Sequence, residues 1–192
     1  MRHNMNLIGK NARNASHLKI NTQIKNKILK RYILLLKKEK KSILKANAQD
    51  LKFAIKKSLK KNLVDRLTLN EKKLNDIQNS IKNIIKLKDP IDNTLEKWIR
   101  PNGLKISRVS IPIGVIGIIY ESRPNVTTDV ASLCFKSGNA AILKGGSEAI
   151  NTNKILAKLF RKVLKENKVN ENFIQFIDSQ DRRMVDFMLS KM

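Results

Sequence analysis

The sequence has no run of about 18 apolar residues, the length at which a helix can span a bilayer. Residues 1–16 lack the apolar core of a secretory signal. The single cysteine, Cys134, excludes an internal disulfide and is typical of a reducing compartment. We therefore expect a cytoplasmic protein with no membrane-spanning segment.

Acidic and aromatic residues are also scarce. There are 16 Asp and Glu residues against 40 Lys and Arg residues, a formal net charge of +24, and aromatic residues make up only 5%. Such a charge is typical of nucleic-acid binding, but few side chains are present that could stack on bases. The joint excess of 30 lysines, 24 isoleucines and 21 asparagines is typical of A/T-rich codons. We interpret the lysines as a solvated surface and expect no nucleic-acid partner, with a basic module for an acidic partner or nucleic acid as the alternative.

Histidine is nearly absent. His3 and His17 both lie in the polar N-terminal region, and no group of His, Cys, Asp and Glu residues has the spacing of metal ligands. The sequence therefore predicts no metal site.

Residues 1–90 contain apolar stripes at helical spacing, which predict a series of helices. The stripes run over Leu7–Ala15, Ile24–Leu36, Ile43–Leu59 and Leu74–Ile85. Thr68 and Glu71 have the spacing of a capping box, which would begin the last of these helices. None of the helices carries a cluster of catalytic residue types, so we interpret residues 1–90 as an N-terminal helical region that serves as scaffold.

Residues 91–112 predict a β-hairpin. Hydrophobicity alternates with a period of two on both sides of Pro101-Asn102-Gly103, and an Asn-Gly pair favours a tight turn. Because the hairpin is mostly polar and precedes a sheet, we expect it to pair with a partner subunit in an oligomer.

Residues 113–192 predict alternating strands and helices. The apolar runs Ile113–Tyr120, Ala140–Leu143 and Asn172–Ile177 predict three strands, with helical spacing between and after them. Strands connected in this way lie parallel and are buried on both faces. The predicted fold class is therefore α/β, with the helical region and hairpin followed by an incomplete Rossmann-like parallel βαβαβ sheet. Three strands would leave a hydrophobic edge bare, so we expect the sequence to be cut short inside a larger domain.

Two polar segments follow the predicted strands. In parallel sheets ligands bind beyond the carboxyl ends of the strands, which here are Glu121–Asn125 and Lys144–Glu148. We expect these two segments to line one shared cleft and to form the functional site.

Asn125 and Lys144 each allow two interpretations. Asn125 could cap the helix that begins at Val126, or its amide could donate to an oxyanion at a reacting carbonyl. Lys144 could be one more solvated lysine, or it could contact a ribose or phosphate. Gly145-Gly146 would let the backbone approach another group closely, and Ser147 would cap the next helix.

Arg123 and Cys134 are similarly ambiguous. Arg123 could bind a phosphate or carboxylate with two hydrogen bonds, or it could pair with Glu121. Cys134 lies on the apolar stripe of the helix between the first two strands, which favours a buried, inert thiol over a nucleophile. That predicted stripe is Val126, Val130, Leu133 and Cys134.

The segment GVIGIIYESRPNVTTDVASLCFKSGNAAILKGGSEA, residues 114–149, closely resembles the segment that typifies the gamma-glutamyl phosphate reductases of the aldehyde dehydrogenase superfamily. The resemblance extends through essentially the whole chain. Its supporting pieces are ANAQD at 46–50, DRL at 65–67, Asp89-Pro90, Asp178 and Asp181-Arg182.

The resemblance implies a chemistry and a set of roles. A cysteine thiolate attacks gamma-glutamyl phosphate and expels phosphate, and NADPH then delivers a hydride to give glutamate-5-semialdehyde, a step of proline biosynthesis. Asn125 matches the asparagine that donates to the oxyanion. Lys144 matches the lysine at the adenosine ribose, with Glu148 near the ribose-side acid. The implied cofactor-binding residues are Lys144, Gly145, Gly146, Ser147 and Glu148, and Ser122 and Arg123 are the implied substrate-binding residues.

One implied element is missing from this sequence. The family's nucleophilic cysteine lies in a later catalytic domain, and Cys134 matches a non-catalytic core position. We therefore expect residues 113–192 to be a partial NADPH-binding domain in a chain that is inactive alone. The alternative is one half of a split reductase. The full-length enzyme is expected to be a homo-oligomer.

Overall fold

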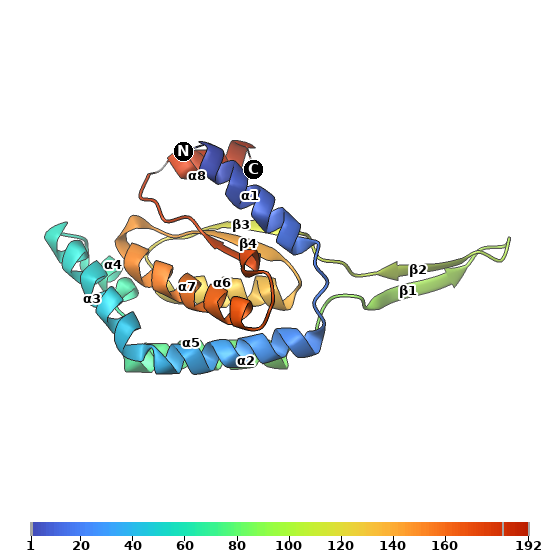
Figure 1. Cartoon of the computed structure of the whole chain (residues 1–192), viewed down its shortest axis with the longest axis horizontal. Helices are drawn as coiled ribbons and strands as arrows, with labels where there is room; N and C mark the ends of the chain where they lie inside the picture. Colours follow the sequence, from blue (N-terminus) through green and yellow to red (C-terminus); the bar gives the residue numbers. More distant parts are fainter. Residues whose placement is uncertain (1, 182, 192) are drawn as a thin grey trace.

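The computed structural model describes residues 2–181 and 183–191 (Figure 1). The helices and strands are, in chain order, α1 (Arg2–Ser16), α2 (Thr22–Lys38), α3 (Lys40–Lys56), α4 (Lys61–Leu67), α5 (Glu71–Lys86), β1 (Thr94–Ile99), β2 (Lys105–Val109), β3 (Val115–Ile119), α6 (Pro124–Lys136), β4 (Ala140–Lys144), the 3₁₀ turn η1 (Ser147–Ala149), α7 (Ile150–Glu166), the 3₁₀ turn η2 (Glu171–Phe173), β5 (Ile174–Phe176) and α8 (Arg183–Lys191).

A three-stranded parallel sheet with the order β3-β4-β5 is the centre of the molecule. Residue Val115 of β3 pairs with Ala140 of β4, and Ile119 pairs with Lys144. Helices α6 and α7 cover one face of the sheet, and α1 and α8 lie over the other (Figure 1). The predicted α/β class and the predicted parallel arrangement of the strands are confirmed.

Helices α2 and α5 form a further layer against α6 and α7 (Figure 1). The side chain of Asn21 caps α2 by accepting from the backbone N–H of Ile24 at 2.8 Å. Asn70 caps α5 in the same way. The predicted capping box of Thr68 and Glu71 is therefore wrong by two residues, because Asn70 supplies the cap.

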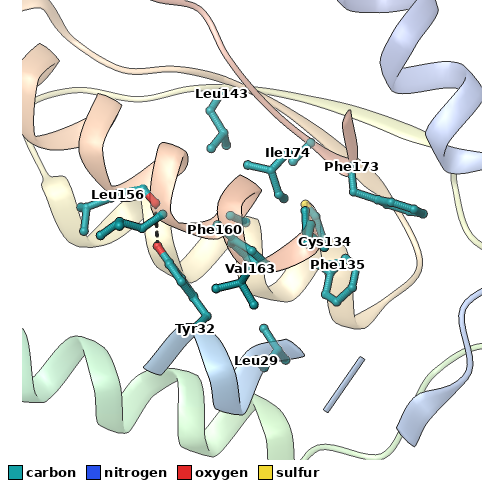
Figure 2. Close-up of a cluster of buried hydrophobic side chains, with 14 of the residues drawn as sticks. Leu29, Tyr32, Cys134, Phe135, Leu143, Leu156, Phe160, Val163, Phe173 and Ile174 are labelled. Carbon is teal, nitrogen blue, oxygen red and sulfur yellow. Dashed lines mark hydrogen bonds between the residues drawn. The ribbon is translucent and has the colours of Figure 1, made fainter. Parts of the chain in front are cut away.

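The hydrophobic core is continuous between these layers (Figure 2). Tyr32 of α2 is fully buried, stacks on Phe160 of α7 with ring centroids 4.4 Å apart, and donates through its hydroxyl to the carbonyl oxygen of Leu156 at 3.0 Å. Phe135 of α6 packs edge-on against both Phe160 and Phe173. The N-terminal helices thus share one core with the sheet.

Two helical stripes differ from the predicted ones. In α3 the buried positions are Ile43, Asn47, Asp50 and Ala54, whereas Ile55 of the predicted stripe is 70% exposed. In α6 the predicted stripe residue Leu133 is 45% exposed, and the buried face is built largely from small and hydroxyl side chains. Apolar residues alone gave the wrong phase because polar residues of both helices are buried. Helix α4 was not predicted.

The β1–β2 hairpin projects away from the rest of the chain (Figure 1). Its base is held by Asp89, which accepts from the Lys25 ammonium at 2.9 Å and from the Thr22 hydroxyl at 2.7 Å. Burial acts to raise the pKa of the Asp89 carboxyl, but the hydrogen bonds from Lys25, Thr22 and the Ile91 backbone outweigh it and hold the pKa below its ordinary value. Gly103 supplies the positive φ of the turn, at 82°.

None of the helices in the described ranges combines the length and the hydrophobicity needed to cross a membrane.

Candidate functional site

A cavity of about 310 Å³ lies beyond the carboxyl ends of β3 and β4. Two paired strand residues, Ile119 and Lys144, open onto it. The remaining lining residues are Leu63, Tyr120, Glu121, Ser122, Gly145, Gly146, Ser147, Glu148, Gln180 and Val185. The cavity therefore brings together Ser122 and the whole of the Lys144–Glu148 segment.

Lys144 is an unusual lysine for a chain with so many exposed ones. It is only 6% exposed, and its ammonium donates to the carbonyl oxygen of Gly145 at 3.0 Å. Burial lowers the pKa of the Lys144 ammonium, while the charges of Glu148 and Asp181 oppose that change. The cavity thus holds a fixed cation with a carboxylate beside it.

Close packing restricts the first glycine of the loop more than the second, because the group that a Cβ on Gly146 would meet is the flexible end of a glutamate side chain. A Cβ on Gly145 would overlap the side-chain amide of Asn153, and a Cβ on Gly146 would overlap the carboxylate of Glu148. The amide nitrogen of Asn153 is buried and has no hydrogen-bond partner among the described residues. The Lys144 ammonium, the Glu148 carboxylate and the Ser147 hydroxyl all line the cavity, and such groups suit the ribose and phosphate groups of a nucleotide.

Ser147 does not cap α7, contrary to the prediction. It opens the 3₁₀ turn η1, and its hydroxyl lies 3.2 Å from the Glu148 carboxylate, to which it donates. The N-terminus of α7 is capped instead from another helix by Asp50. This buried carboxylate accepts from the backbone N–H groups of Asn151 at 3.1 Å and Thr152 at 2.8 Å, and from both of their side chains.

Asp50 and its neighbour Asn47 were missed as site-supporting residues. Asn47 donates to the carbonyl oxygen of Leu67 at 2.9 Å and accepts from the N–H of Leu69 at 2.8 Å. The available signal was their spacing, because Asn47 and Asp50 continue the helical stripe that starts at Ile43. Together they fix α4 and the start of α7 against α3.

Asn125 lies in the first turn of α6, not at its cap. Arg123 occupies the N-cap position and Pro124 follows, so the interpretation of Asn125 as an N-cap is wrong. The Asn125 side chain is exposed, and its NH₂ group donates to a carboxylate oxygen of Asp129 at 3.2 Å. An NH₂ group has two hydrogens, so one remains available to a ligand.

Asn125 lines a second cavity, of about 360 Å³, and not the cavity of Lys144. The expectation of one shared cleft is therefore corrected to two neighbouring cavities. The cavities are neighbours on two sides. Helix α4 contributes Leu63 to the first cavity and Arg66 to the second, and Ser122, in the turn before α6, lines the first while Asn125, in the first turn of α6, lines the second. Residues 120–123, which connect β3 directly to α6, lie between the two cavities.

Arg123 is exposed and lines neither cavity. Its backbone N–H donates to the Glu121 carbonyl oxygen at 2.8 Å, but in the described part of the chain the two side chains form no ion pair. The alternative of a structural pair with Glu121 is therefore wrong, and the Arg123 guanidinium faces solvent.

Cys134 is buried in the core, as predicted (Figure 2). Burial raises the pKa of its thiol to about 11. Because the thiolate is the nucleophilic form, Cys134 is unsuited to attack a substrate.

The fold is of the aldehyde dehydrogenase type. A probable aldehyde dehydrogenase from Listeria monocytogenes matches 98% of this chain and 40% of its own with a TM-score of 0.69. Their sequences are only 13% identical, so this likeness concerns the fold alone.

Comparison of the amino-acid sequence with those of known proteins identifies the family within this fold. A gamma-glutamyl phosphate reductase from Persephonella marina is 46% identical over 172 residues, which are 90% of this chain and 39% of that protein. The crystal structure of a gamma-glutamyl phosphate reductase from Thermotoga maritima matches with a TM-score of 0.94 and 41% identity, over 96% of this chain and 45% of that one. The chain belongs to the gamma-glutamyl phosphate reductase family and spans about two fifths of the length of the curated relatives it matches. No family model matches the sequence.

Proposed function

We propose that this chain supplies the nucleotide-binding loop and the oxyanion donor of a reductase that converts gamma-glutamyl phosphate to glutamate-5-semialdehyde with NADPH and releases phosphate, in proline biosynthesis. The observation that carries the proposal is the cavity beyond β3 and β4, in which Lys144 and the Gly145–Glu148 loop meet.

The nucleotide is proposed to bind through the groups that line this cavity. The Lys144 ammonium would donate to the adenosine ribose and its 2′-phosphate, and the Glu148 carboxylate would accept from a ribose hydroxyl. Gly145, Gly146 and Ser147 would form the surface against which the sugar and phosphates lie. The reduced nicotinamide, when bound, supplies the hydride.

The second cavity is proposed to hold the acyl group that reacts. Asn125 would donate to the acyl oxygen as negative charge develops on it, and Asp129 holds one of the two amide hydrogens so that the other can point at the substrate. Ser122 and the exposed Arg123, at the turn between the cavities, are proposed to contact the substrate, Arg123 through the phosphate that leaves.

A thiolate nucleophile is needed for this chemistry, and Cys134 does not provide it because it is buried. We therefore propose that this chain shows no turnover alone. We further propose residues 1–90, 91–112 and 113–192 as the helical, hairpin and nucleotide-binding parts of a cytoplasmic enzyme. In it, the hairpin serves homo-oligomerisation.

Titration of the purified chain with NADPH, followed by nucleotide fluorescence, tests the proposal. The substitution Lys144→Gln should weaken binding by about tenfold, because a charged hydrogen bond is lost. Lys158→Gln is the matched control, since Lys158 is an exposed lysine of α7 away from both cavities.

Both variants lower the net charge equally, so nonspecific attraction to a basic protein affects them equally. Equal NADPH affinities of the two variants would contradict the proposal. A parallel assay for NADPH-dependent turnover is expected to give none, and measurable turnover would contradict the proposal that this chain is inactive alone.

A further inference from the structure

The second cavity carries charges of both signs around the amide of Asn125. Its cationic side chains are Arg66 and Lys73, and its carboxylates are Asp76 and Asp129. Leu69, Ile77 and Pro124 add an apolar wall. A cavity lined in this way suits a short zwitterion with an aliphatic chain, which is the chemistry of an amino acid.

Asp129 is the carboxylate that most needs a partner. One of its oxygens accepts from Asn125 at 3.2 Å, while the other, Oδ1, is buried and has no hydrogen-bond partner among the described residues. A buried carboxylate oxygen without a partner is costly, and rotation of the Asp129 side chain would bring Oδ1 to an ammonium group placed in the cavity.

The two cations differ in their freedom to bind a ligand. The Lys73 ammonium already donates to the carbonyl oxygens of Asp65 at 2.7 Å and Thr68 at 2.6 Å. Arg66 is exposed and forms no ion pair in the described part of the chain. Its planar guanidinium can hold a carboxylate with two parallel hydrogen bonds.

The separation of these groups suits a particular chain length. Asn125 and Asp129 are one helical turn apart on α6, and their side chains meet, with the Asn125 amide nitrogen 3.2 Å from an Asp129 carboxylate oxygen. In a glutamyl group the four bonds from the acyl carbon to the α-nitrogen span roughly 5 Å when extended. A glutamyl group with its acyl oxygen at the Asn125 amide is therefore long enough for its α-ammonium to reach the adjacent Asp129 carboxylate.

We propose that this cavity recognises the α-amino acid end of the substrate, with Asp129 accepting from the α-ammonium and Arg66 holding the α-carboxylate. The proposal rests on the proposed function for the assignment of the acyl group to Asn125. The proposed contact also explains how the negative charge of Asp129 can be tolerated next to a developing oxyanion. The carboxylate alone opposes negative charge at Asn125, and the substrate's own ammonium neutralises it.

Binding of L-glutamate and of glutarate to the purified chain, followed by NMR chemical-shift titration, tests the proposal. Glutarate has the same carbon chain and two carboxylates but no ammonium. A merely basic surface prefers glutarate because of its greater negative charge. The cavity should instead bind L-glutamate about tenfold more tightly.

Two variants separate the roles. Asp129→Asn keeps the size of the side chain and should abolish the preference for L-glutamate. Arg66→Gln should weaken binding of both ligands by about tenfold and retain the preference. Asp65→Asn is the matched control, because it removes an exposed carboxylate of the same helix α4 that does not line the cavity.

The NADPH titration is repeated on each variant, and circular dichroism checks that each is folded. Unchanged NADPH affinity with a lost L-glutamate preference in Asp129→Asn supports the proposal. If the unsubstituted chain does not bind NADPH but still prefers L-glutamate, the proposed nucleotide site is refuted and the proposed amino acid site is supported. Three outcomes would overturn the site: no measurable L-glutamate binding, glutarate bound at least as tightly by the unsubstituted chain, or an unchanged preference in Asp129→Asn.

Discussion

Lys144 and Glu148 place opposite charges in the cavity beyond the strands, and the two charges act differently on the two nicotinamide nucleotides. A carboxylate accepts well from a ribose 2′-hydroxyl but repels a 2′-phosphate. An ammonium attracts the phosphate. If the proposed nucleotide site is correct, the preference between NADPH and NADH should be a balance between two side chains four residues apart.

Replacing the carboxylate tests this balance. Glu148→Gln keeps the shape of the side chain and removes its charge, so NADPH should bind about fivefold more tightly at low salt. NADH should bind more weakly, because the ribose hydroxyl loses a charged acceptor. Fluorescence titrations of the chain with both nucleotides measure the change in their ratio.

The ionic strength and a substitution far from the cavity serve as controls for this experiment. The gain for NADPH should shrink as ionic strength rises, since the Debye length falls to about 8 Å at 0.15 M. Glu166→Gln, which removes an exposed carboxylate at the C-terminal end of α7 that lines neither cavity, should leave the ratio unchanged. A parallel loss of both affinities in Glu148→Gln would mean that Glu148 supports the loop and does not select the nucleotide.

Among the helices and strands, the contact between α3 and α7 holds the Gly145–Ala149 loop in place. Asp50 of α3 satisfies the first N–H groups of α7, which directly follows the Gly145–Ala149 loop. Helix N-termini carry free N–H groups and a partial positive charge, so a buried carboxylate there is well placed. The loop is therefore anchored by a residue nearly 100 positions earlier in the chain.

Removing this anchor should destabilise the whole fold. Asp50→Ala leaves four donors of Asn151 and Thr152 without their acceptor, so the free energy of unfolding should fall by about 3 kcal/mol. Urea denaturation followed by circular dichroism measures this change. Asp65→Ala, which removes an exposed carboxylate of α4, should cost less than about 0.5 kcal/mol. Similar losses in the two variants would contradict a capping role for Asp50.

The sequence predicted the strands better than it predicted the helix faces. Buried parallel strands consist of apolar residues throughout, so Ala140–Leu143 and its neighbours were visible as continuous runs. The face of α3 was misjudged because Asn47 and Asp50 are buried by partners that lie far away in sequence. Local patterns do not record such partners.

The candidate site shows the same limit. The Lys144–Glu148 segment and Ser122 were correctly expected to meet, because the pairing of parallel strands dictates it. Asn125 was expected in the same cleft but faces another one, since α4 and the turn before α6 divide the space. Helix α4 was not predicted from its short sequence, so this division could not be foreseen.

At the scale of the whole molecule, the hairpin is the feature that a single chain does not explain. It projects from the body (Figure 1). Large apolar side chains along it and along its connection to β3 are exposed. These side chains are Leu95, Trp98, Ile99, Leu104, Val109, Ile111 and Ile113. Clustered exposed apolar side chains mark a surface that binds another protein, and a strand edge can also pair with a second chain.

We expect this surface to mediate self-association, and Ile99→Asp tests it. Burying an isoleucine side chain contributes about 1.5–3 kcal/mol, so a charge at this position should weaken dimer formation at least about tenfold, as measured by sedimentation equilibrium. Leu34→Asp is the matched control, because Leu34 of α2 and Ile99 are each 66% exposed but lie on different parts of the molecule. If both substitutions weaken association equally, exposure alone matters and the hairpin has no special role. If the unsubstituted chain is monomeric at every concentration, the hairpin does not suffice to join two copies of this chain.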